Sequence, residues 1–239
     1  MTGEAPPPRA SDGLALRVVS AVVLAPLAVG IAYLGGWPFV VFWAIAAIVI
    51  LAEWIAIVRS SATAPSAGRA IWYAAGVVYA GAMLVACVLL RRDADYGFVA
   101  IVLLFGVVWA TDILGYFVGR AIGGPRLWPA VSPKKTWSGA LGGAAGAIAA
   151  ALAIASYAYR ANPLAITGLA LLLSAVSQGG DLLESAVKRR FGVKDAGHII
   201  PGHGGVMDRL DGFLAAAVVA AIIGVARGGI DAARGLLVW

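Results

Sequence analysis

Apolar residues in this chain are grouped in blocks of about 20, and short segments rich in glycine, proline and charge separate the blocks. An α-helix rises about 1.5 Å per residue, so a block of this length can cross the roughly 30 Å of hydrocarbon in a bilayer. The blocks lie at about 16–34, 38–58, 70–90, 96–119, 138–158, 163–187 and 210–226. The pattern predicts an all-α fold, a polytopic transmembrane helical bundle of about seven spans, or about eight with a short C-terminal helix.

The segments around these blocks divide the chain into predicted regions. Residues 1–13, rich in proline and charge, are expected to form a disordered cytoplasmic tail. The following regions are the N-terminal transmembrane helices at 14–106, a candidate catalytic transmembrane region with cytoplasmic loops at 107–227, and a C-terminal interfacial segment at 228–239. The first apolar block is followed by no cleavage site of the usual small-residue kind, so we interpret it as a retained helix rather than a signal peptide.

Composition excludes a water-soluble domain. Hydrophobic residues make up 62% of the chain and charged residues 13%, with a mean hydropathy of +0.91, whereas soluble domains average about 25% charged residues. The single cysteine, Cys87, cannot form a disulfide within the chain and is expected to be a small buried hydrophobe. The net charge of +6 lies between the spans, so it indicates topology or phosphate recognition rather than nucleic-acid binding.

The distribution of cations predicts the orientation in the membrane. If the N-terminus is cytoplasmic and the spans alternate, 13 of the 18 lysine and arginine residues lie on the cytoplasmic side. This excess agrees with the positive-inside rule. We therefore expect the polar loops of the region 107–227 to face the cytoplasm.

Charged residues inside the apolar blocks are the first candidates for chemistry, because a charge near the bilayer centre costs at least about 2.5 kcal/mol. Asp181, Glu184, Ser185 and Lys188 are spaced so that they share one face of a helix. The alternative to a functional site is an intramembrane stripe of salt bridges. Glu53, in the second block, is interpreted as a structural residue that faces a neighbouring helix.

A second acidic pair, Asp208 and Asp211, also shares one helical face. It follows the basic loop that begins after Lys188, so the two acidic faces could converge on either side of that loop. Hard carboxylate oxygens at this density suit Mg²⁺, which usually takes a few carboxylates together with water and substrate phosphate. The predicted metal ligands are Asp181, Glu184, Asp208 and Asp211.

The loop between the two acidic faces is the densest polar stretch of the chain. Lys188, Arg189 and Lys194 of this stretch are candidate phosphate-binding cations, and so is Arg209, which follows it. Gly204 and Gly205 would allow the backbone to approach a ligand closely. His203 could bind phosphate or a base, although a solvated histidine or a flexible loop that only sets topology would look similar.

A second polar island follows the fourth apolar block. Asp112 lies in that block, and the residues just before the next block that could bind a lipid headgroup or a nucleotide phosphate are Lys134, Lys135 and Thr136. Lysines next to a membrane often serve topology alone. No cluster with zinc-ligand spacing, no phosphate-binding loop of the Walker type and no serine nucleophile elbow is found in the sequence.

The basic loop and its flanks resemble the signature of phosphatidate cytidylyltransferases, also called CDP-diacylglycerol synthases. The matching segments are SAVKR at 185–189, KDAG at 194–197 and IPGHGGVMDRLD at 200–211, so the resemblance runs over 27 residues. The second island, which begins at Ser132, and Asp112 are also similar to stretches of that family, and the resemblance implies that Ser132, Asp112 and Ser185 bind substrate. The chain departs from the family in Ser138, where glutamate is usual, and in Ile113, where serine or threonine is usual.

The resemblance implies that CTP and phosphatidic acid give CDP-diacylglycerol and pyrophosphate at the cytoplasmic face of a bacterial inner (plasma) membrane. It also implies Mg²⁺, a second cation such as K⁺, and a homodimer in the lipid bilayer. By resemblance, Asp181, Asp208 and Asp211 are acidic metal-site positions. Together with Lys188 and Arg209 they are the predicted catalytic residues.

Other interpretations share part of this chemistry. A CTP-dependent kinase of polyprenols or phytol, or a synthase of the CDP-archaeol type, would have similar needs. An ion-coupled transporter would use the intramembrane acids as coupling sites, and internal repeats would favour it. An inactive scaffold on the same fold is a further alternative, which the complete set of acids and cations argues against.

Overall fold

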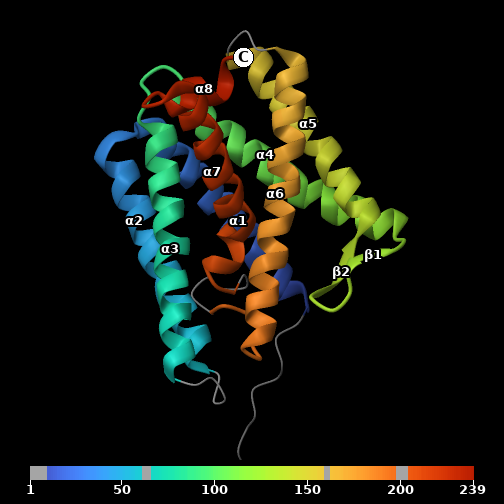
Figure 1. Ribbon diagram of the computed structural model, residues 1–239. Helices are drawn as coiled ribbons and strands as arrows, with labels where there is room; N and C mark the ends of the chain where they lie inside the picture. Colours follow the sequence, from blue (N-terminus) through green and yellow to red (C-terminus); the bar gives the residue numbers. More distant parts are fainter. Residues whose placement is uncertain (1–9, 61–65, 159–161, 198–203) are drawn as a thin grey trace, which may run out of the picture.

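The computed structural model describes residues 10–60, 66–158, 162–197 and 204–239, with the side chains of 10–21 and 66–67 excepted. In chain order the elements are α1 (Ala10–Leu34), α2 (Gly36–Ser60), α3 (Ser66–Arg91), α4 (Gly97–Ile122), β1 (Arg126–Trp128), β2 (Ser132–Thr136), α5 (Trp137–Ala158), α6 (Pro163–Arg190), α7 (Met207–Gly228) and α8 (Ala232–Leu237). The helices form one bundle, and the two strands form a small hairpin at its side (Figure 1).

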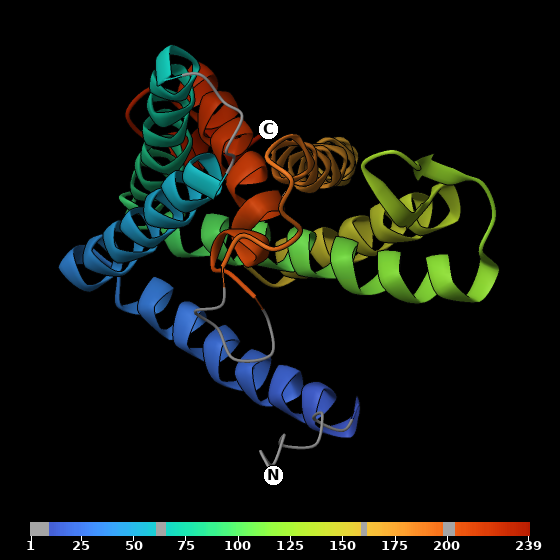
Figure 2. The ribbon, with the colours of Figure 1, turned by 90° about the horizontal axis from the view of Figure 1, so that it is seen from below.

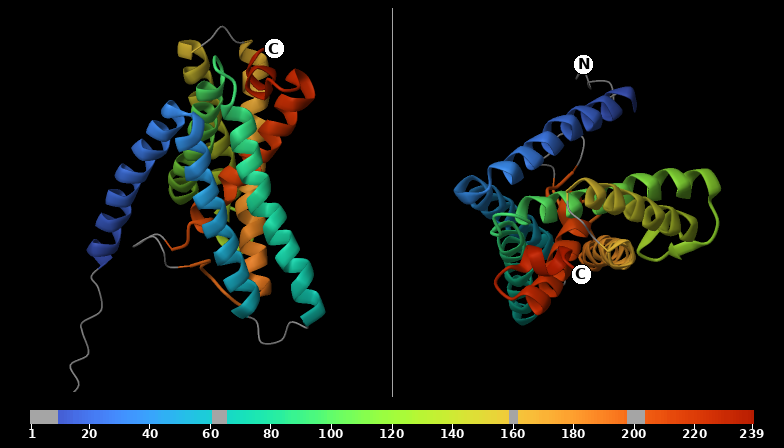
Figure 3. Two further views of the ribbon diagram at one scale, coloured as in Figure 1. Left: turned by 90° about the vertical axis from the view of Figure 1, so that its left-hand side faces the viewer. Right: turned by 90° about the horizontal axis from the view of Figure 1, so that it is seen from above.

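In the described chain, six helices, α2 to α7, are long and apolar enough to cross a membrane. α1 adds a shorter apolar stretch, Val22–Leu34, and slants away from the other helices toward its N-terminal end (Figure 3). The predicted apolar blocks fall on these helices to within one residue, so the polytopic helical bundle is confirmed. Of the predicted tail, residues 1–9 lie outside the described chain and Ala10 already belongs to α1.

Local sequence explains where the helices around the polar region begin and end. α6 begins after Asn162, whose side chain accepts a hydrogen bond of 3.0 Å from the backbone N–H of Leu164, with Pro163 at the first helical position. α4 ends at Ile122, and the two residues that follow it, Gly123 and Gly124, have φ values of 66° and 102°. Glycine adopts such values without steric cost, so the chain can turn out of the helix into the hairpin.

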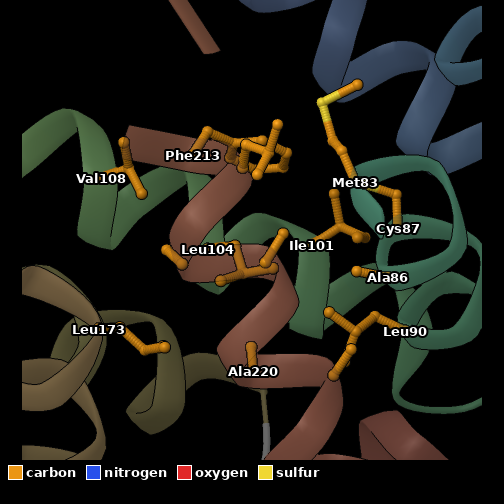
Figure 4. Close-up of a cluster of buried hydrophobic side chains, with 14 of the residues drawn as sticks. Met83, Ala86, Cys87, Leu90, Ile101, Leu104, Val108, Leu173, Phe213 and Ala220 are labelled. Atoms are coloured by element: carbon orange, nitrogen blue, oxygen red, sulfur yellow. The ribbon is translucent and has the colours of Figure 1, made fainter. Parts of the chain in front are cut away.

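The apolar core fixes α7 in the middle of the bundle. Trp43 of α2 stacks on Phe213 of α7 with ring centroids 5.0 Å apart, and Phe213 lies 5.2 Å from Phe105 of α4. Met83 and Cys87 of α3 are fully buried in the same cluster, as was expected for the cysteine (Figure 4). Contacts with three helices therefore hold α7 in place at the level of Phe213.

α4 and α5 pack closely and extend away from the other helices toward the hairpin (Figure 2). A Cβ atom on Gly139 would lie 2.7 Å from the carbonyl oxygen of Gly115, and one on Gly143 would lie 2.6 Å from that of Thr111, so only glycine fits there. The hairpin joins the two helices, with Arg126 and Thr136 as antiparallel partners. It replaces the loop that the sequence predicts between the fourth and fifth spans.

Candidate active site

A cavity of about 820 Å³ lies between α4, α5, α6, α7 and the hairpin, at the end of the bundle where α6 ends and α7 begins. Its size is typical of a site for a small molecule. The predicted site residues that line it are Asp112, Lys134, Lys135, Thr136, Asp181, Lys188, Asp208, Arg209 and Asp211. The structure thus brings the polar residues between Asp181 and Asp211 and those of the second polar island together around one cavity.

Two glycines bring the acidic faces of α6 and α7 together. A Cβ atom on Gly212 would lie 2.5 Å from Ser177 Oγ, and one on Gly180 would lie 2.8 Å from the carbonyl oxygen of Asp211. The helices therefore approach almost to backbone contact at this level. Asp181 follows Gly180 directly, so this close contact places it and Asp211 in the same cavity wall.

Lys188 lies between two carboxyl groups and joins α6 to α7. Its Nζ is 2.5 Å from Asp208 Oδ1 and 3.0 Å from Glu184 Oε1, and the Glu184 side chain is fully buried. Asp208 Oδ2 also accepts hydrogen bonds from the backbone N–H groups of Ala196 at 3.0 Å and Gly205 at 2.9 Å. Asp208 thus ties the lysine, the basic loop and the first turn of α7 together.

A second ion pair closes the cavity from the side of the hairpin. Lys135 Nζ of β2 contacts Asp181 Oδ2 of α6 directly. Ser185 Oγ, one turn further along α6, donates a hydrogen bond of 3.4 Å to Asp181 Oδ1. Both partners of the ion pair are partly exposed to the cavity, with 26% and 32% of their side-chain surface accessible, so a ligand can reach them.

The other predicted residues of the hairpin have mainly structural contacts. Thr136 Oγ1 accepts a hydrogen bond of 3.1 Å from the backbone N–H of Gly139 and so caps the start of α5. Ser138, which departs from the family pattern, donates to the carbonyl oxygen of Gly123 at 2.5 Å. Ser132 pairs with Trp128 at the start of β2 and lies outside the cavity wall.

Several predicted residues of the basic loop lie outside the cavity wall. Arg189 donates to a backbone carbonyl of its own loop at 3.3 Å, and Lys194 is exposed. Gly204 has a φ of 86°, and a Cβ atom there would lie 2.9 Å from Asp208 Oδ2, so this glycine makes room for the aspartate. His203 lies outside the described residues.

Five polar side chains of the cavity wall are not among the predicted site residues: Thr111, Tyr116, Arg120, Gln178 and Asp195. Arg120 Nη1 donates a hydrogen bond of 2.9 Å to the hydroxyl oxygen of Tyr116. Gln178 lies three residues before Asp181 in an apolar helix, so the helical spacing that groups Asp181 with Lys188 could also have identified it.

Within the described ranges, no group of three or more Asp, Glu, His or Cys side chains is placed to hold a metal ion. Two of the cavity acids, Asp181 and Asp208, are paired with lysines instead. Their oxygens nevertheless suit Mg²⁺, which often takes only one or two carboxylates with water and substrate phosphates. The residues therefore fit a metal ion that binds together with a polyphosphate, and the predicted four-ligand site stays a prediction.

Comparison with known proteins gives consistent matches over this region. A model described as "Cytidylyltransferase family" matches residues 65–226, which include the whole cavity wall. A phosphatidate cytidylyltransferase of Brucella abortus biovar 1 (strain 9-941) is 41% identical over 253 aligned residues, covering 89% of this chain and 94% of the relative. The enzyme of that name from Bacillus subtilis (strain 168) is 37% identical over 176 residues, covering 72% of this chain and 63% of the relative. One from Staphylococcus aureus (strain COL) is 44% identical over 111 residues, or 46% and 43% of the two chains.

Proposed function

The chain belongs to the cytidylyltransferase family, and from this membership we propose that it transfers the cytidylyl group of CTP to phosphatidic acid. The products are CDP-diacylglycerol, for phospholipid synthesis, and pyrophosphate. The observation that supports the proposal most directly is the cavity in which carboxylates of α6 and α7 face lysines of β2 and α6. A cavity lined by both signs of charge suits a reaction that brings two phosphate groups and their counterions together.

The reaction needs charge neutralisation more than it needs a nucleophilic side chain. A phosphate oxygen of phosphatidic acid attacks the α-phosphorus of CTP, and the bond from that phosphorus to the oxygen bridging to the β-phosphate breaks. The electron pair leaves with pyrophosphate. Phosphate monoesters are largely ionised near pH 7, so neither a strong base nor a covalent intermediate is required. The main obstacle is repulsion between two anions, which fixed cations reduce.

Lys135 and Lys188 are the cations placed to do this. Each is paired with a carboxylate beside the cavity, and a phosphate oxygen of CTP can replace that carboxylate as its partner. Lys134 and Arg209 line the same cavity and add positive charge for the second substrate. Holding both substrates in one orientation supplies much of the remaining rate enhancement.

We extend the proposal to a requirement for Mg²⁺. Asp181, Asp208 and Asp211 are the residues that would hold the ion, and bound Mg²⁺ would neutralise phosphate charge and stabilise the leaving pyrophosphate. Glu184 keeps Lys188 in position and is the candidate contact for a second cation such as K⁺. Removal of Mg²⁺ with EDTA should abolish product formation. Stabilisation of the protein by CTP in a thermal-shift assay should also require added Mg²⁺.

Phosphatidic acid would reach the cavity from the cytoplasmic leaflet of a bacterial inner membrane. Apolar side chains of α4 next to Asp112, namely Ile113 and Phe117, are 54% and 60% exposed and can contact acyl chains. The phosphate group of the lipid would then lie at the level of the lysines. We also propose that the protein forms the homodimer that the resemblance implies.

The orientation can be tested with single cysteines in a Cys87→Ala background. Ser60 ends α2 and Asp95 precedes α4, and both are exposed at opposite ends of the bundle. In intact cells, a membrane-impermeant maleimide should label Asp95→Cys, and it should label Ser60→Cys only after lysis. The reverse pattern would refute the cytoplasmic location of the cavity.

The proposed function is tested by reconstitution. The purified protein, phosphatidic acid in mixed micelles, Mg²⁺ and CTP labelled at the α-phosphate should give labelled CDP-diacylglycerol and pyrophosphate in equal amounts. Release of CDP with a phosphorylated lipid would instead show a CTP-dependent lipid kinase. Absence of any lipid product from folded protein would refute the proposal.

A further inference from the structure

Glu53 is a buried acidic residue outside both the cavity and the segment matched by the family model. It lies in α2, it is 4% exposed, and it does not line the cavity. Its two carboxylate oxygens accept hydrogen bonds from the start of α7. The backbone N–H of Val206 is 3.0 Å from Oε1, and that of Met207 is 2.7 Å from Oε2. Glu53 therefore caps the helix that contains Asp208 and Asp211, from a distant helix of the chain.

The two glycines that flank the loop make room for this carboxylate. A Cβ atom on Gly197 would lie 2.7 Å from Glu53 Oε1, and one on Gly205 would lie 2.8 Å from both oxygens. Any side chain at either position would collide with the carboxylate or push it away from α7. Gly205, which the sequence predicts to allow close approach of a ligand, thus has Glu53 as a second partner.

The backbone segments that surround Glu53 are also those that hold Asp208. Gly205 and Ala196, the neighbour of Gly197, donate their N–H groups to Asp208 Oδ2 at 2.9 and 3.0 Å. The backbone at Ala196–Gly197 and at Gly205 therefore lies between Glu53 on one side and Asp208 on the other. Displacement of Glu53 would move the backbone donors of Asp208, and through Asp208 it would alter the contact with Lys188.

We propose that Glu53 is a positioning residue for cytidylyl transfer: it fixes the first turn of α7 and the adjoining loop so that Asp208 and Lys188 face the cavity. The inference rests on the proposed function, because its main readout is that reaction. It extends the prediction of Glu53 as a structural residue facing a neighbouring helix, because that neighbour, α7, contains Asp208 and Asp211. A purely structural residue would change the amount of folded protein but leave the kinetic constants of the folded fraction unchanged.

The first test replaces the carboxylate by an amide. Glu53→Gln presents an NH₂ group to a backbone N–H, so one of the two hydrogen bonds is lost at nearly constant volume. In folded, monodisperse protein we expect kcat/KM for CTP to fall at least about tenfold, with a raised KM for CTP. Hydrogen exchange of the Val206 and Met207 amides should become faster in the same variant.

Asp93→Asn is the matched control. Asp93 accepts hydrogen bonds from the backbone N–H groups of Asp95 at 3.0 Å and Tyr96 at 2.8 Å, just before α4 and at the opposite end of the bundle. The same carboxylate-to-amide change there should leave KM for CTP within about twofold of the wild type, because no group of the cavity is attached to it.

A double-mutant cycle tests the contact itself. Gly205→Ala alone should lower kcat/KM at least about tenfold, because its methyl group collides with Glu53. In the Glu53→Ala background the methyl group has room, so the double variant should be within about twofold of Glu53→Ala. Additive losses, or wild-type kinetic constants in Glu53→Gln, would overturn the inference.

The outcomes separate this inference from the proposed function. If the wild-type protein makes no CDP-diacylglycerol, the proposed function fails whatever Glu53 does. If the wild type is active and the Glu53 variants lose only folded protein, with KM and hydrogen exchange unchanged, the positioning role alone fails. If Glu53→Gln does not fold, Gly205→Ala in the wild-type background decides, because it leaves the Glu53 carboxylate in place and alters no charge. Wild-type kinetic constants in that folded variant would overturn the inference.

Discussion

Basic side chains stabilise both ends of the bundle, but their partners differ. At the end where α1 meets α2, Arg91 donates to the carbonyl oxygen of Tyr33 at 3.1 Å, and where α7 meets α8, Arg227 donates to that of Val238 at 3.1 Å. These carbonyl oxygens lie at the C-terminal ends of helices, where a carbonyl oxygen has no hydrogen-bond partner within its own helix. The two arginines therefore complete the backbone hydrogen bonding of the fold.

At the cavity end, Lys135 and Lys188 pair with the carboxylates of Asp181 and Asp208. Phosphate oxygens and carboxylates are alternative partners for the same ammonium group, so these contacts can be exchanged when a ligand binds. A cation that caps a helix cannot change partners without disrupting the helix end. We therefore expect substitutions at the cavity end to reduce catalysis and substitutions at the other end to reduce stability.

Asp208→Asn should give the largest effect. The amide is a poor partner for Lys188, and its NH₂ group can face the N–H donors of Ala196 and Gly205. Formation of CDP-diacylglycerol from labelled CTP should fall at least about 1,000-fold, or roughly 4 kcal/mol. Asp231→Asn, an exposed position at the opposite end, should retain wild-type activity. An Asp208→Asn enzyme with more than a tenth of wild-type activity would contradict the role of this carboxylate.

Lys135→Ala should have the next largest effect, because it removes the ammonium group that reaches α6 from the hairpin. We expect kcat/KM for CTP to fall about 100-fold, or roughly 2.7 kcal/mol, with little change in the thermal midpoint, since a partly exposed ion pair contributes little to stability. Arg126→Ala on β1, an exposed cation of the same hairpin, is the control and should lose less than about threefold. Equal losses in the two variants would mean that hairpin charge in general, rather than this pair, matters.

The helices and the acids could be predicted from sequence for one physical reason. The bilayer requires apolar blocks of fixed length, so charges inside such blocks or at their ends are conspicuous and their helical spacing can be read directly. Asp181, Lys188, Asp208 and Asp211 are found in this way, and the structure places them all in one cavity wall.

The contacts that complete the site could not be predicted in this way. The hairpin has strands of three and five residues, too short for a period-two pattern, and they are joined by the turn at residues 129–131. The partner of Lys135 depends on where the hairpin folds in space. Glu53 accepts hydrogen bonds from backbone N–H groups more than 150 residues away in the sequence. Every residue except proline has such a donor, so the residue types do not show which donors Glu53 contacts.

Gly212→Ala tests the close approach of α6 and α7 and should have an intermediate effect. The added methyl group would lie 2.5 Å from Ser177 Oγ, so the helices must separate and the two acidic faces with them. We expect about a tenfold loss of kcat/KM together with a loss of about 1–3 kcal/mol in stability. Gly168→Ala in α6 is the control, since nothing lies within 4 Å of a Cβ atom there, and it should be neutral or slightly stabilising.

Arg227→Ala should have the smallest effect on catalysis, and it tests the helix-capping arginines of the comparison. Arg227 donates to the carbonyl oxygens of Gly235 and Val238, and its guanidinium lies 3.5 Å from the centroid of the Trp239 ring. Its loss leaves acceptors at the end of α8 without a partner, so we expect the thermal midpoint in detergent to fall by several degrees, from a cost of about 1–3 kcal/mol. The kcat of the remaining folded protein should stay within about twofold of the wild type.

Arg234→Ala, which removes an exposed cation from α8, is the control and should change neither the thermal midpoint nor kcat. A stable Arg227→Ala protein with activity as low as that of Lys135→Ala would mean that cations at both ends serve the reaction, and the distinction between exchangeable and capping partners would be wrong.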